Sequence, residues 1–287
     1  MTLTRSDVSR LLEAHGLSPS RALGQNFVAD PNTVRKIVRL AMVQPGDLVV
    51  EVGGGLGSLT LALLEAGARV TVVEKDRWLV PVLGEVLSER APGAPVRVVQ
   101  ADAMVLDWSA LLEGGPWSLV ANLPYNVATP LVADLLDRVP AVVAMTVMVQ
   151  KEAADRLVAG PGSPAYGAVS VKVAYWAEAR LLASVPSSVF VPRPRVASAV
   201  VGIRRRAVPA LSPAVAGPEE LFRVVRAGFA QRRKMLRRSL AVLGAGPSCF
   251  EAAGVGPSAR PEELSLSQWG ALAAALRDAA VAPEAGR

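Results

Sequence analysis

The sequence predicts an α/β protein built on a doubly wound, mostly parallel sheet, with a small helical domain at the C-terminus. Two observations lead to this fold class. Between residues 47 and 150, short β-branched runs alternate with helical stretches, which is the pattern of strand–helix–strand units in a parallel sheet. Beyond residue 220 the strand-like runs stop, and apolar residues recur at helical spacing.

Each expected strand is a nearly continuous apolar run, as parallel strands covered on both faces require. Five such runs carry the sheet, over residues 47–52, 69–74, 95–100, 117–123 and 141–149. The helices expected between them span 56–66, 76–89 and 128–138. A helix over 151–159 precedes two more strand-like runs, 181–185 and 197–204, which we expect to complete the sheet.

The C-terminal part of the chain is separated by a linker. Residues 207–220 contain three prolines and no periodic pattern. In 221–240, one narrow helical stripe is apolar; it consists of Phe222, Val225, Phe229, Leu236 and Leu240. Three basic residues, Arg223, Lys234 and Arg238, lie well away from this stripe. The sequence therefore predicts an α/β ligand-binding domain over residues 1–206 and a small helical domain with a basic helix over residues 207–287.

Two residue counts exclude whole classes of site. The 287 residues include one cysteine, Cys249, and one histidine, His15. Neither a disulfide framework nor a zinc site of the Cys/His type can be assembled from them, and we expect no bound metal. A hydrolytic triad would have to use His15, which lies in a polar N-terminal stretch.

Hydropathy predicts no membrane association. No apolar run approaches the roughly 20 residues that span a bilayer, and the first residues lack the apolar core of a signal peptide. A single cysteine is consistent with a reducing compartment. We therefore expect a cytoplasmic protein with no membrane partner.

The basic residues are concentrated in one part of the chain. Residues 193–238 carry 12 basic and two acidic residues, a local charge of +10 within a net charge of +6. This segregation predicts a surface that meets a polyanion such as nucleic acid. Solvated arginines without a partner are the alternative.

A glycine loop follows the first expected strand, in the sequence Glu51-Val-Gly-Gly-Gly-Leu-Gly-Ser58. Glycines let a ligand approach the backbone closely at the strand end where α/β folds bind ligands. A dinucleotide fold needs glycine at the sixth position of this loop, where Ser58 stands. The spacing of Gly53, Gly55 and Gly57 instead suits a nucleoside without phosphate, such as S-adenosylmethionine, and a tight turn without a ligand remains the alternative.

Acids end the next two strands. Glu74 can accept hydrogen bonds from both hydroxyls of a ribose, although NAD-binding folds place an acid similarly. Asp102, after the third strand, can accept a hydrogen bond from the exocyclic amine of an adenine. Both are also consistent with surface residues at strand ends, but the same edge of the sheet carries all three groups.

The fourth strand ends in Asn122-Leu123-Pro124-Tyr125, which resembles the Asn/Asp-x-Pro-aromatic motif of methyltransferases that act on planar amino nitrogens. The exocyclic amine of adenine is a poor nucleophile because its lone pair is delocalised into the ring. Two acceptors, the Asn122 side-chain oxygen and the Leu123 carbonyl, would favour a pyramidal nitrogen. Pro124 stiffens the loop, and Tyr125 offers a ring on which a flipped base stacks.

The form Asn-Leu-Pro-Tyr-Asn is similar to that of the ribosomal RNA small-subunit adenine N6,N6-dimethyltransferase family, the kasugamycin-sensitivity methyltransferases. The resemblance covers most of the chain, through the segments 23–28, 150–157, 166–170, 189–198 and 229–236. It implies a Rossmann-like class I S-adenosylmethionine-dependent methyltransferase domain. Gly54 departs from the family, which usually has proline there.

The same resemblance implies residue roles. The cofactor positions would be Asn26, the Val28 backbone, Gly53, Gly55, Glu74, Asp102 and Asn122. The catalytic set would be Asn122, Leu123, Pro124 and Tyr125, with Phe190 as a second aromatic that sandwiches the target base. The residues expected to bind RNA phosphates are Arg193, Arg195, Arg223, Arg226, Arg232, Arg233 and Lys234.

The implied function is dimethylation of N6 of two adjacent adenines near the 3′ end of small-subunit rRNA, on an assembling 30S particle, by a monomer. Three alternatives stay open. The first is the large-subunit (23S) rRNA adenine methyltransferase of macrolide resistance, which shares the loop and the Asn-x-Pro-Tyr motif. The second is a ribosome-assembly factor with secondary catalysis. The third, an NAD oxidoreductase, is disfavoured by Ser58 and by the lack of a catalytic histidine.

Overall fold

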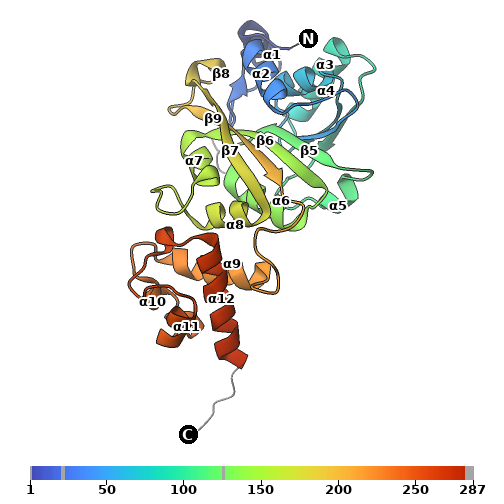
Figure 1. Ribbon diagram of the computed structural model, residues 1–287. Coiled ribbons are helices and arrows are strands. Elements are labelled where there is room, and N and C mark those ends of the chain that lie inside the picture. The colour runs from blue at the N-terminus through green and yellow to red at the C-terminus, as the bar shows by residue number, and fades with distance from the viewer. Residues whose placement is uncertain (1, 21–22, 125–126, 282–287) are drawn as a thin grey trace. The chain divides into compact units, whose positions relative to one another are not determined.

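The computed structural model (Figure 1) describes residues 2–20, 23–124 and 127–281 of the chain. It divides into two compact units. Unit 1 comprises Met1–Ala154 and Ala179–Arg205, and unit 2 comprises Asp155–Glu178 and Arg206–Arg287. The chain thus passes into unit 2 twice, once within the helix Lys151–Val158 and once at the start of the expected linker.

Unit 1 is built on a seven-stranded sheet with the order β4-β3-β2-β5-β6-β9-β7. Its strands are β2 (Leu48–Val52), β3 (Arg69–Glu74), β4 (Val96–Gln100), β5 (Trp117–Asn122), β6 (Val142–Gln150), β7 (Ala177–Val185) and β9 (Ser198–Arg205). The pairs among β2 to β6 are parallel, and β9 runs antiparallel to β6. The predicted α/β fold class is therefore confirmed.

The strand order reverses between β2 and β5, because the chain first builds outward through β3 and β4 and then crosses back. In open α/β sheets this switch point leaves a crevice at the carboxyl ends of the strands. The glycine loop follows β2 and the Asn-Leu-Pro motif follows β5, so both lie at this crevice.

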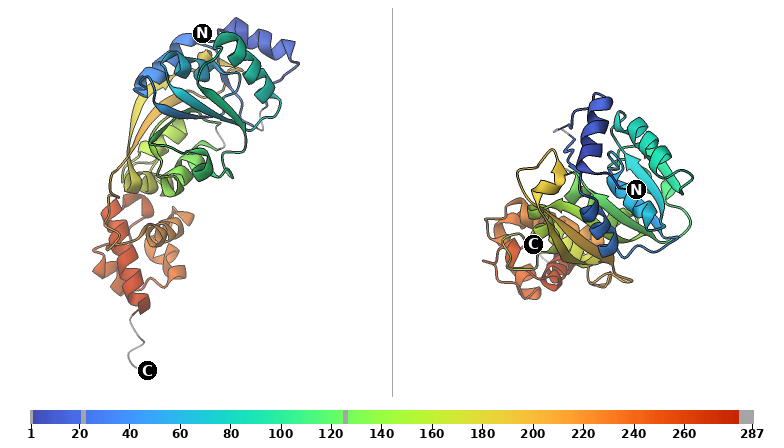
Figure 2. Two further views of the ribbon diagram at one scale, coloured as in Figure 1. Left: turned by 90° about the vertical axis from the view of Figure 1, so that its right-hand side faces the viewer. Right: turned by 90° about the horizontal axis from the view of Figure 1, so that it is seen from above.

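Helices of unit 1 lie on both faces of the sheet (Figure 2). They are α1 (Arg5–Ala14), α2 (Pro31–Leu40), α3 (Ser58–Glu65), α4 (Leu79–Arg90), α5 (Trp108–Leu111) and α6 (Ala128–Arg138). Helices α1 and α2 lie outside the predicted elements. Each begins at a capping residue, Thr4 with Asp7 in a capping box and Asp30 before Pro31, so the signal was present in the sequence.

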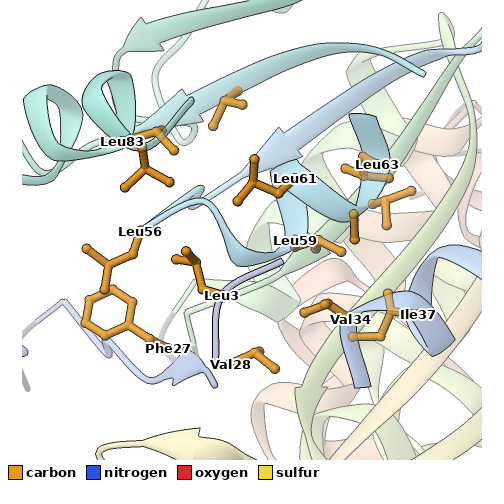
Figure 3. Packing of buried hydrophobic residues seen from close by; sticks show 14 of the residues in the cluster. Leu3, Phe27, Val28, Val34, Ile37, Leu56, Leu59, Leu61, Leu63 and Leu83 are labelled. Atoms are coloured by element: carbon orange, nitrogen blue, oxygen red, sulfur yellow. The ribbon is translucent and has the colours of Figure 1, made fainter. Parts of the chain in front are cut away.

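One hydrophobic cluster packs the four helices α1, α2, α3 and α4 against the sheet. It includes Val49, Val70 and Val72 from the seven-stranded sheet, Phe27 from the N-terminal segment and Leu56 from the glycine loop. Figure 3 shows part of this cluster, with the ring of Phe27 and Leu56 among the labelled side chains. The glycine loop is therefore packed from the side by the N-terminal segment.

A second, two-stranded sheet brings distant segments together. Strand β1 (Phe27–Val28) pairs antiparallel with β8 (Phe190–Val191), so that Val28 lies opposite Phe190. The Ala29 N–H also donates to the Val189 carbonyl at 2.8 Å. Two segments singled out in the sequence, around Asn26 and around Phe190, are thus joined through their backbones.

The remaining elements are mostly helical. They are α7 (Lys151–Val158), α8 (Ala168–Trp176), the 3-10 turn η1 (Ser187–Val189), α9 (Pro218–Ala230), α10 (Leu236–Ser239), η2 (Ala241–Leu243), α11 (Pro247–Ala252), η3 (Pro261–Glu263) and α12 (Leu266–Val281). A second core, around Tyr166, Phe222 and Trp269, holds the helices of unit 2 together. Cys249 is buried and free in this core.

The structure corrects two predicted elements. The helix expected over 221–240 is broken between α9 and α10, because Met235 is extended and the Leu236 N–H donates to the Ala259 carbonyl at 2.9 Å. Strand β7 begins at residue 177 instead of 181. It lies at the edge of the sheet, where exposed residues such as Glu178 hide the apolar pattern.

Within the described ranges, no helix is long and apolar enough to cross a membrane.

Candidate active site

A cavity of about 160 Å³ lies at the crevice predicted by the strand order, within unit 1. Its walls come from five places in the chain: the N-terminal segment, the glycine loop, and the ends of β3, β4 and β5. The lining residues include Asn26, Val28, Gly53, Gly55, Glu74, Asp102, Asn122, Leu123 and Pro124. The cavity thus brings together all the residues predicted to bind the cofactor.

The glycine loop needs glycine for its backbone and for space. Gly53 and Gly55 have φ angles of +79° and +56°, which favour glycine. A Cβ on Gly55 would lie 3.1 Å from the ring of Phe27. The loop is therefore held against the N-terminal segment with no room for a side chain at this point.

Glu74 is buried at the end of β3, and its two oxygens hold the backbone around the cavity. Oε2 accepts from the Gly55 N–H at 2.8 Å, and Oε1 accepts from the Asp76 N–H at 2.9 Å. Burial raises the pKa of this carboxyl, against the lowering effect of those two hydrogen bonds. Glu74 thus fixes the glycine loop and presents an acidic group to the cavity.

Asp102, at the end of β4, is half-buried and paired. Its Oδ2 accepts from Lys75 Nζ at 2.7 Å, and its Oδ1 accepts from the Met104 N–H at 3.0 Å. The hydrogen bond from Lys75 is the main reason that the pKa of Asp102 is lowered. The carboxyl is therefore ionised at neutral pH and held at the cavity wall.

Asn122 ends β5 and is oriented by the N-terminal segment. Its Nδ2 donates to the Asn26 carbonyl at 3.0 Å, which leaves Oδ1 as the end available to accept a hydrogen bond. The Leu123 N–H donates to the Met148 carbonyl at 3.0 Å, and this bond fixes the strand exit. Asn122 and Leu123 both line the cavity, whereas Tyr125 lies outside the described residues.

The N-terminal segment is tied to the sheet by its own polar side chains. Gln25 Nε2 donates to Asp76 Oδ2 at 2.7 Å, and Asn26 Nδ2 donates to the Gly24 carbonyl at 3.1 Å. These bonds hold residues 24–28 at the mouth of the cavity.

Phe190 lies away from the cavity wall. Its side chain is fully buried, at 0% exposure, in the cluster that includes Phe27 and Val28. In this arrangement the ring offers no open face to a base, so its stacking role stays a prediction that requires the ring to become accessible.

Glu51 is a site residue that sequence analysis did not single out. It is 1% exposed in β2, lines the cavity, and accepts from Thr60 Oγ1 at 2.6 Å through Oε2. Burial raises its pKa to about 8. An acid inside an otherwise apolar strand, directly before the glycine loop, was the signal that could have identified it.

The residues predicted to bind RNA lie on both units. Arg193 and Arg195 are exposed in unit 1. In unit 2, Arg223, Arg226, Arg233 and Lys234 are exposed. Arg232 is engaged within unit 2, because its Nη2 donates to the Pro164 carbonyl at 2.6 Å and its Nε lies 4.0 Å from Glu262 Oε2.

No group of three or more His, Cys, Asp or Glu side chains in the described part of the chain is arranged to hold a metal ion. The polar groups around the cavity are amides, carboxylates and backbone groups, which can exchange hydrogen bonds with an uncharged sugar and base.

The fold and this cavity define a class I methyltransferase, in which the glycine loop, the two strand-end acids and the Asn-Leu-Pro motif share one crevice. Comparison with known proteins is consistent with this class. The family model described as ribosomal RNA adenine dimethylase matches residues 17–277. The chain belongs to this ribosomal RNA adenine dimethylase family, and it is an enzyme that uses S-adenosylmethionine to methylate ribosomal RNA.

Curated relatives are similar over nearly the whole chain. The ribosomal RNA small subunit methyltransferase A of Kineococcus radiotolerans is 50% identical over 278 residues, which cover 95% of this chain and 91% of the relative. That of Magnetococcus marinus is 46% identical over 269 residues, which cover 93% and 95%.

Two solved structures share the fold. The 23S rRNA methyltransferase ErmE superimposes with a TM-score of 0.66 at 28% identity, covering 88% of this chain and 100% of that one. A dimethyladenosine transferase from Plasmodium falciparum gives a TM-score of 0.70 at 22% identity, covering 85% and 94%.

The residues present fit S-adenosylmethionine. The cavity is lined by glycines that permit close approach, and acids stand at the ends of β3 and β4 where a ribose and an adenine amine need acceptors. A phosphate-binding loop would require glycine where Ser58 stands, so the donor set favours a nucleoside over a dinucleotide.

Proposed function

We propose that this enzyme transfers two methyl groups to N6 of each of two adjacent adenines near the 3′ end of small-subunit (16S) rRNA. The observation that carries the proposal is Asn122: its amide nitrogen is taken by the Asn26 carbonyl at 3.0 Å, so its oxygen is the end that can meet an amine at the cavity. The 46–50% identity to small-subunit methyltransferases supports the choice of rRNA.

The cofactor would be held by the residues of the cavity wall. Glu74 accepts from the ribose hydroxyls and Asp102 from the adenine amine, while Gly53 and Gly55 allow the backbone to approach. Asn26 and the Val28 backbone close the site from the N-terminal side. Bound S-adenosylmethionine supplies an electrophilic methyl group on a sulfonium.

The remaining chemistry consists of positioning the amine. Asn122 Oδ1 and the Leu123 carbonyl accept from the two hydrogens of the adenine amine and localise its lone pair. Pro124 fixes the strand exit, and Tyr125 stacks on the flipped base, a contact worth ~1–3 kcal/mol. No charged general base is needed beside the uncharged Asn122, because the methylated, quaternised nitrogen is acidic and loses its proton without a strong base. Holding the reactants in place accounts for most of the rate.

Phe190 would form the second face of the base-binding slot. Phe190 pairs with Val28, which lines the cavity. A movement of β1 and β8 that admits the base would therefore also expose the Phe190 ring.

The substrate would be an assembling 30S particle, methylated by a monomer in the cytoplasm. Residues 1–206 would form the catalytic domain, and residues 207–287 would carry the basic RNA-binding helix. The seven basic residues would contact phosphates without reading sequence, as is usual for structured RNA; they are Arg193, Arg195, Arg223, Arg226, Arg232, Arg233 and Lys234.

The large-subunit enzyme is the second candidate, because the ErmE structure shares the fold at 28% identity. The higher identity of the small-subunit relatives favours the first. An assembly factor with secondary catalysis is the third, and it would retain its effect on ribosomes when methyl transfer is abolished.

A labelled-methyl transfer experiment tests the proposal. Small and large ribosomal subunits from cells lacking these modifications are incubated separately with the enzyme and tritiated S-adenosylmethionine. We expect N6,N6-dimethyladenosine in the small-subunit rRNA alone, at two adjacent primer-extension stops. Label in the large subunit would assign the enzyme to the second candidate, and label in neither would contradict both.

A further inference from the structure

We propose that a groove at the start of α4, in unit 1, binds a base of single-stranded rRNA outside the cavity. Trp78 provides the surface on which the base stacks, and Arg77 contacts a phosphate. The proposal rests on rRNA as the substrate and does not depend on which ribosomal subunit supplies it. It adds an RNA contact that the seven predicted basic residues do not include.

Trp78 is the exposed tryptophan of the chain. All five tryptophans lie within the described ranges, and Trp78 is 62% exposed. The other four are buried or half-buried; they are Trp108, Trp117, Trp176 and Trp269. Tryptophan is on average a well-buried residue, so this ring leaves a large aromatic surface open to a ligand.

The ring stands on a fixed backbone. Trp78 directly precedes α4, and its N–H donates to Asp76 Oδ1 at 2.9 Å. The next residue, Leu79, is buried in the first turn of the helix. Asp76 Oδ2 accepts from Gln25 Nε2 at 2.7 Å. The same hydrogen bonds that hold the N-terminal segment at the cavity therefore also hold the ring, and a fixed ring loses little freedom when a base binds.

Arg77 adds a cation to this platform. Its Cζ lies 4.7 Å from the centroid of the Trp78 ring. A ring with both faces covered could not keep an exposure of 62%, so the face opposite Arg77 is open to a base. Stacking orients the guanidinium without using its N–H donors. Those donors have no partner among the described residues and can meet a phosphate.

The acids beside the groove each have a partner of their own. Asp102 Oδ2 accepts from Lys75 Nζ at 2.7 Å, and Glu85 Oε2 lies 3.4 Å from His15 Nε2. Arg77 is thus a cation of the groove that no acid of the described ranges neutralises. A phosphate there would meet an unpaired positive charge.

The platform borders a groove that adjoins the cavity. The groove has a volume of about 660 Å³, which lies within the roughly 300–1,000 Å³ of small-molecule sites. Leu23 and Lys75 line both the groove and the cavity. An RNA strand that delivers an adenine to the cavity therefore passes within reach of Trp78. Polar side chains complete the groove wall; they include His15, Ser18 and Ser20.

Tryptophan fluorescence with hexauridylate tests the site, since uridine has no exocyclic amine for the catalytic motif. We expect hexauridylate to quench the emission of the parent and to leave that of Trp78→Ala unquenched. By anisotropy of labelled hexauridylate, Trp78→Ala should bind at least about fivefold more weakly, the low end for a base stacked on an aromatic ring. Trp78→Phe keeps a ring and should stay within about threefold of the parent.

Arg77→Ala tests the phosphate contact separately. It should bind hexauridylate more weakly, and its slope of log affinity against log salt should fall by about 0.7, the value for one phosphate of a single strand.

Two exposed residues at the opposite end of the strands provide matched controls. Met42, which is 55% exposed, precedes β2, and Arg69 is the first residue of β3. Met42→Ala should leave the quenching unchanged, and Arg69→Ala should leave the salt slope unchanged. All variants should keep the parent's melting temperature and bind S-adenosylmethionine within twofold of the parent, because Trp78 and Arg77 do not line the cavity.

The outcomes separate this site from the proposed function. An unquenched parent, or quenching that persists in Trp78→Ala, would overturn the site. Weaker binding of Trp78→Ala to intact small subunits, with hexauridylate binding unchanged, would assign the groove to a ribosomal protein and overturn the RNA contact. The proposed function fails on a different result, namely a parent that leaves unmodified small subunits unmethylated.

Discussion

Glu51 is an acid in a strand of buried valines and a leucine. It is 1% exposed, and it accepts a hydrogen bond from the hydroxyl of Thr60. Burial, the hydrogen bond from Thr60 and the nearby Glu74 together place its pKa at about 8, with burial the largest cause. At neutral pH the carboxyl is therefore mostly protonated, and it sits at the cavity as a neutral group that can ionise beside a cation.

This pKa has a consequence for stability. In the unfolded chain Glu51 ionises near its ordinary pKa of 4.5, whereas in the folded protein it stays protonated up to about pH 8. Between these values the unfolded state binds fewer protons, so this residue lowers the free energy of unfolding as the pH rises. Glu51→Gln should abolish that contribution. Urea unfolding at pH 5 and pH 8 should show the variant gaining stability relative to the parent at pH 8.

Glu113→Gln is the control for this titration, since Glu113 is exposed at a loop. If Glu51→Gln and Glu113→Gln shift the free energy of unfolding equally between the two pH values, then Glu51 is not buried in its protonated form.

At the scale of elements, the glycine loop is shaped by the strand beside it. Gly54 stands where the family usually has proline. The space that a side chain at this position would need is occupied by neighbouring side chains. A Cβ there would lie 2.4 Å from Val72 Cγ1 and 3.1 Å from Leu83 Cδ2. Real Cβ atoms do not approach that closely, so glycine at 54 and valine at 72 fit each other.

Gly54→Ala should therefore destabilise the fold by about 1–3 kcal/mol, the usual cost of overpacking. Shortening Val72 to alanine in the same chain should make the double variant less destabilised than the sum of the two single variants. Chemical denaturation of all four proteins measures this coupling.

Gly84→Ala is the matched control, because a Cβ at Gly84 in α4 meets nothing within 4 Å. It should leave stability unchanged or raise it. Simple additivity of Gly54→Ala and Val72→Ala would contradict the packing described.

The strands were predictable because buried parallel strands are continuous apolar runs. The cavity residues were predictable because the ends of these strands carry polar groups, and parallel strands place those ends at one edge of the sheet. The missed helices α1 and α2 are short, and their signals are local capping residues such as Thr4 with Asp7. The break after Ala230 was not predictable, since it depends on the Ala259 carbonyl, which is distant in the sequence. The burial of Phe190 likewise follows from its pairing with Val28.

At the scale of the whole molecule, basic residues occur on both units. On α9, Arg223 and Arg226 are exposed, while Phe222 and Val225 of the same helix are buried. One helix therefore anchors itself in the unit 2 core and presents cations to solvent, which is an arrangement suited to contacting phosphates.

If both arginines contact phosphates, the double variant Arg223→Ala/Arg226→Ala should bind rRNA more weakly and with less dependence on salt. The slope of log affinity against log salt should fall by about 1.5, since each lost contact accounts for about 0.7 to 0.9. Filter binding from 50 to 300 mM salt gives this slope.

Arg277→Ala is the control, because Arg277 lies in the same unit and pairs with Glu220 and Asp278. An unchanged slope in the double variant would show that α9 does not face the RNA.

The role of Asn122 in activating the adenine amine can be tested directly. Single-turnover methyl transfer to unmodified small subunits is compared for the parent and Asn122→Ala, with the affinity for S-adenosylmethionine measured on the same samples. We predict that the variant binds the cofactor within about tenfold of the parent, the loss expected from one hydrogen-bonded anchor, while its transfer rate falls by at least about a hundredfold. A rate that falls no further than the cofactor affinity would contradict a role for this amide in activating the adenine amine.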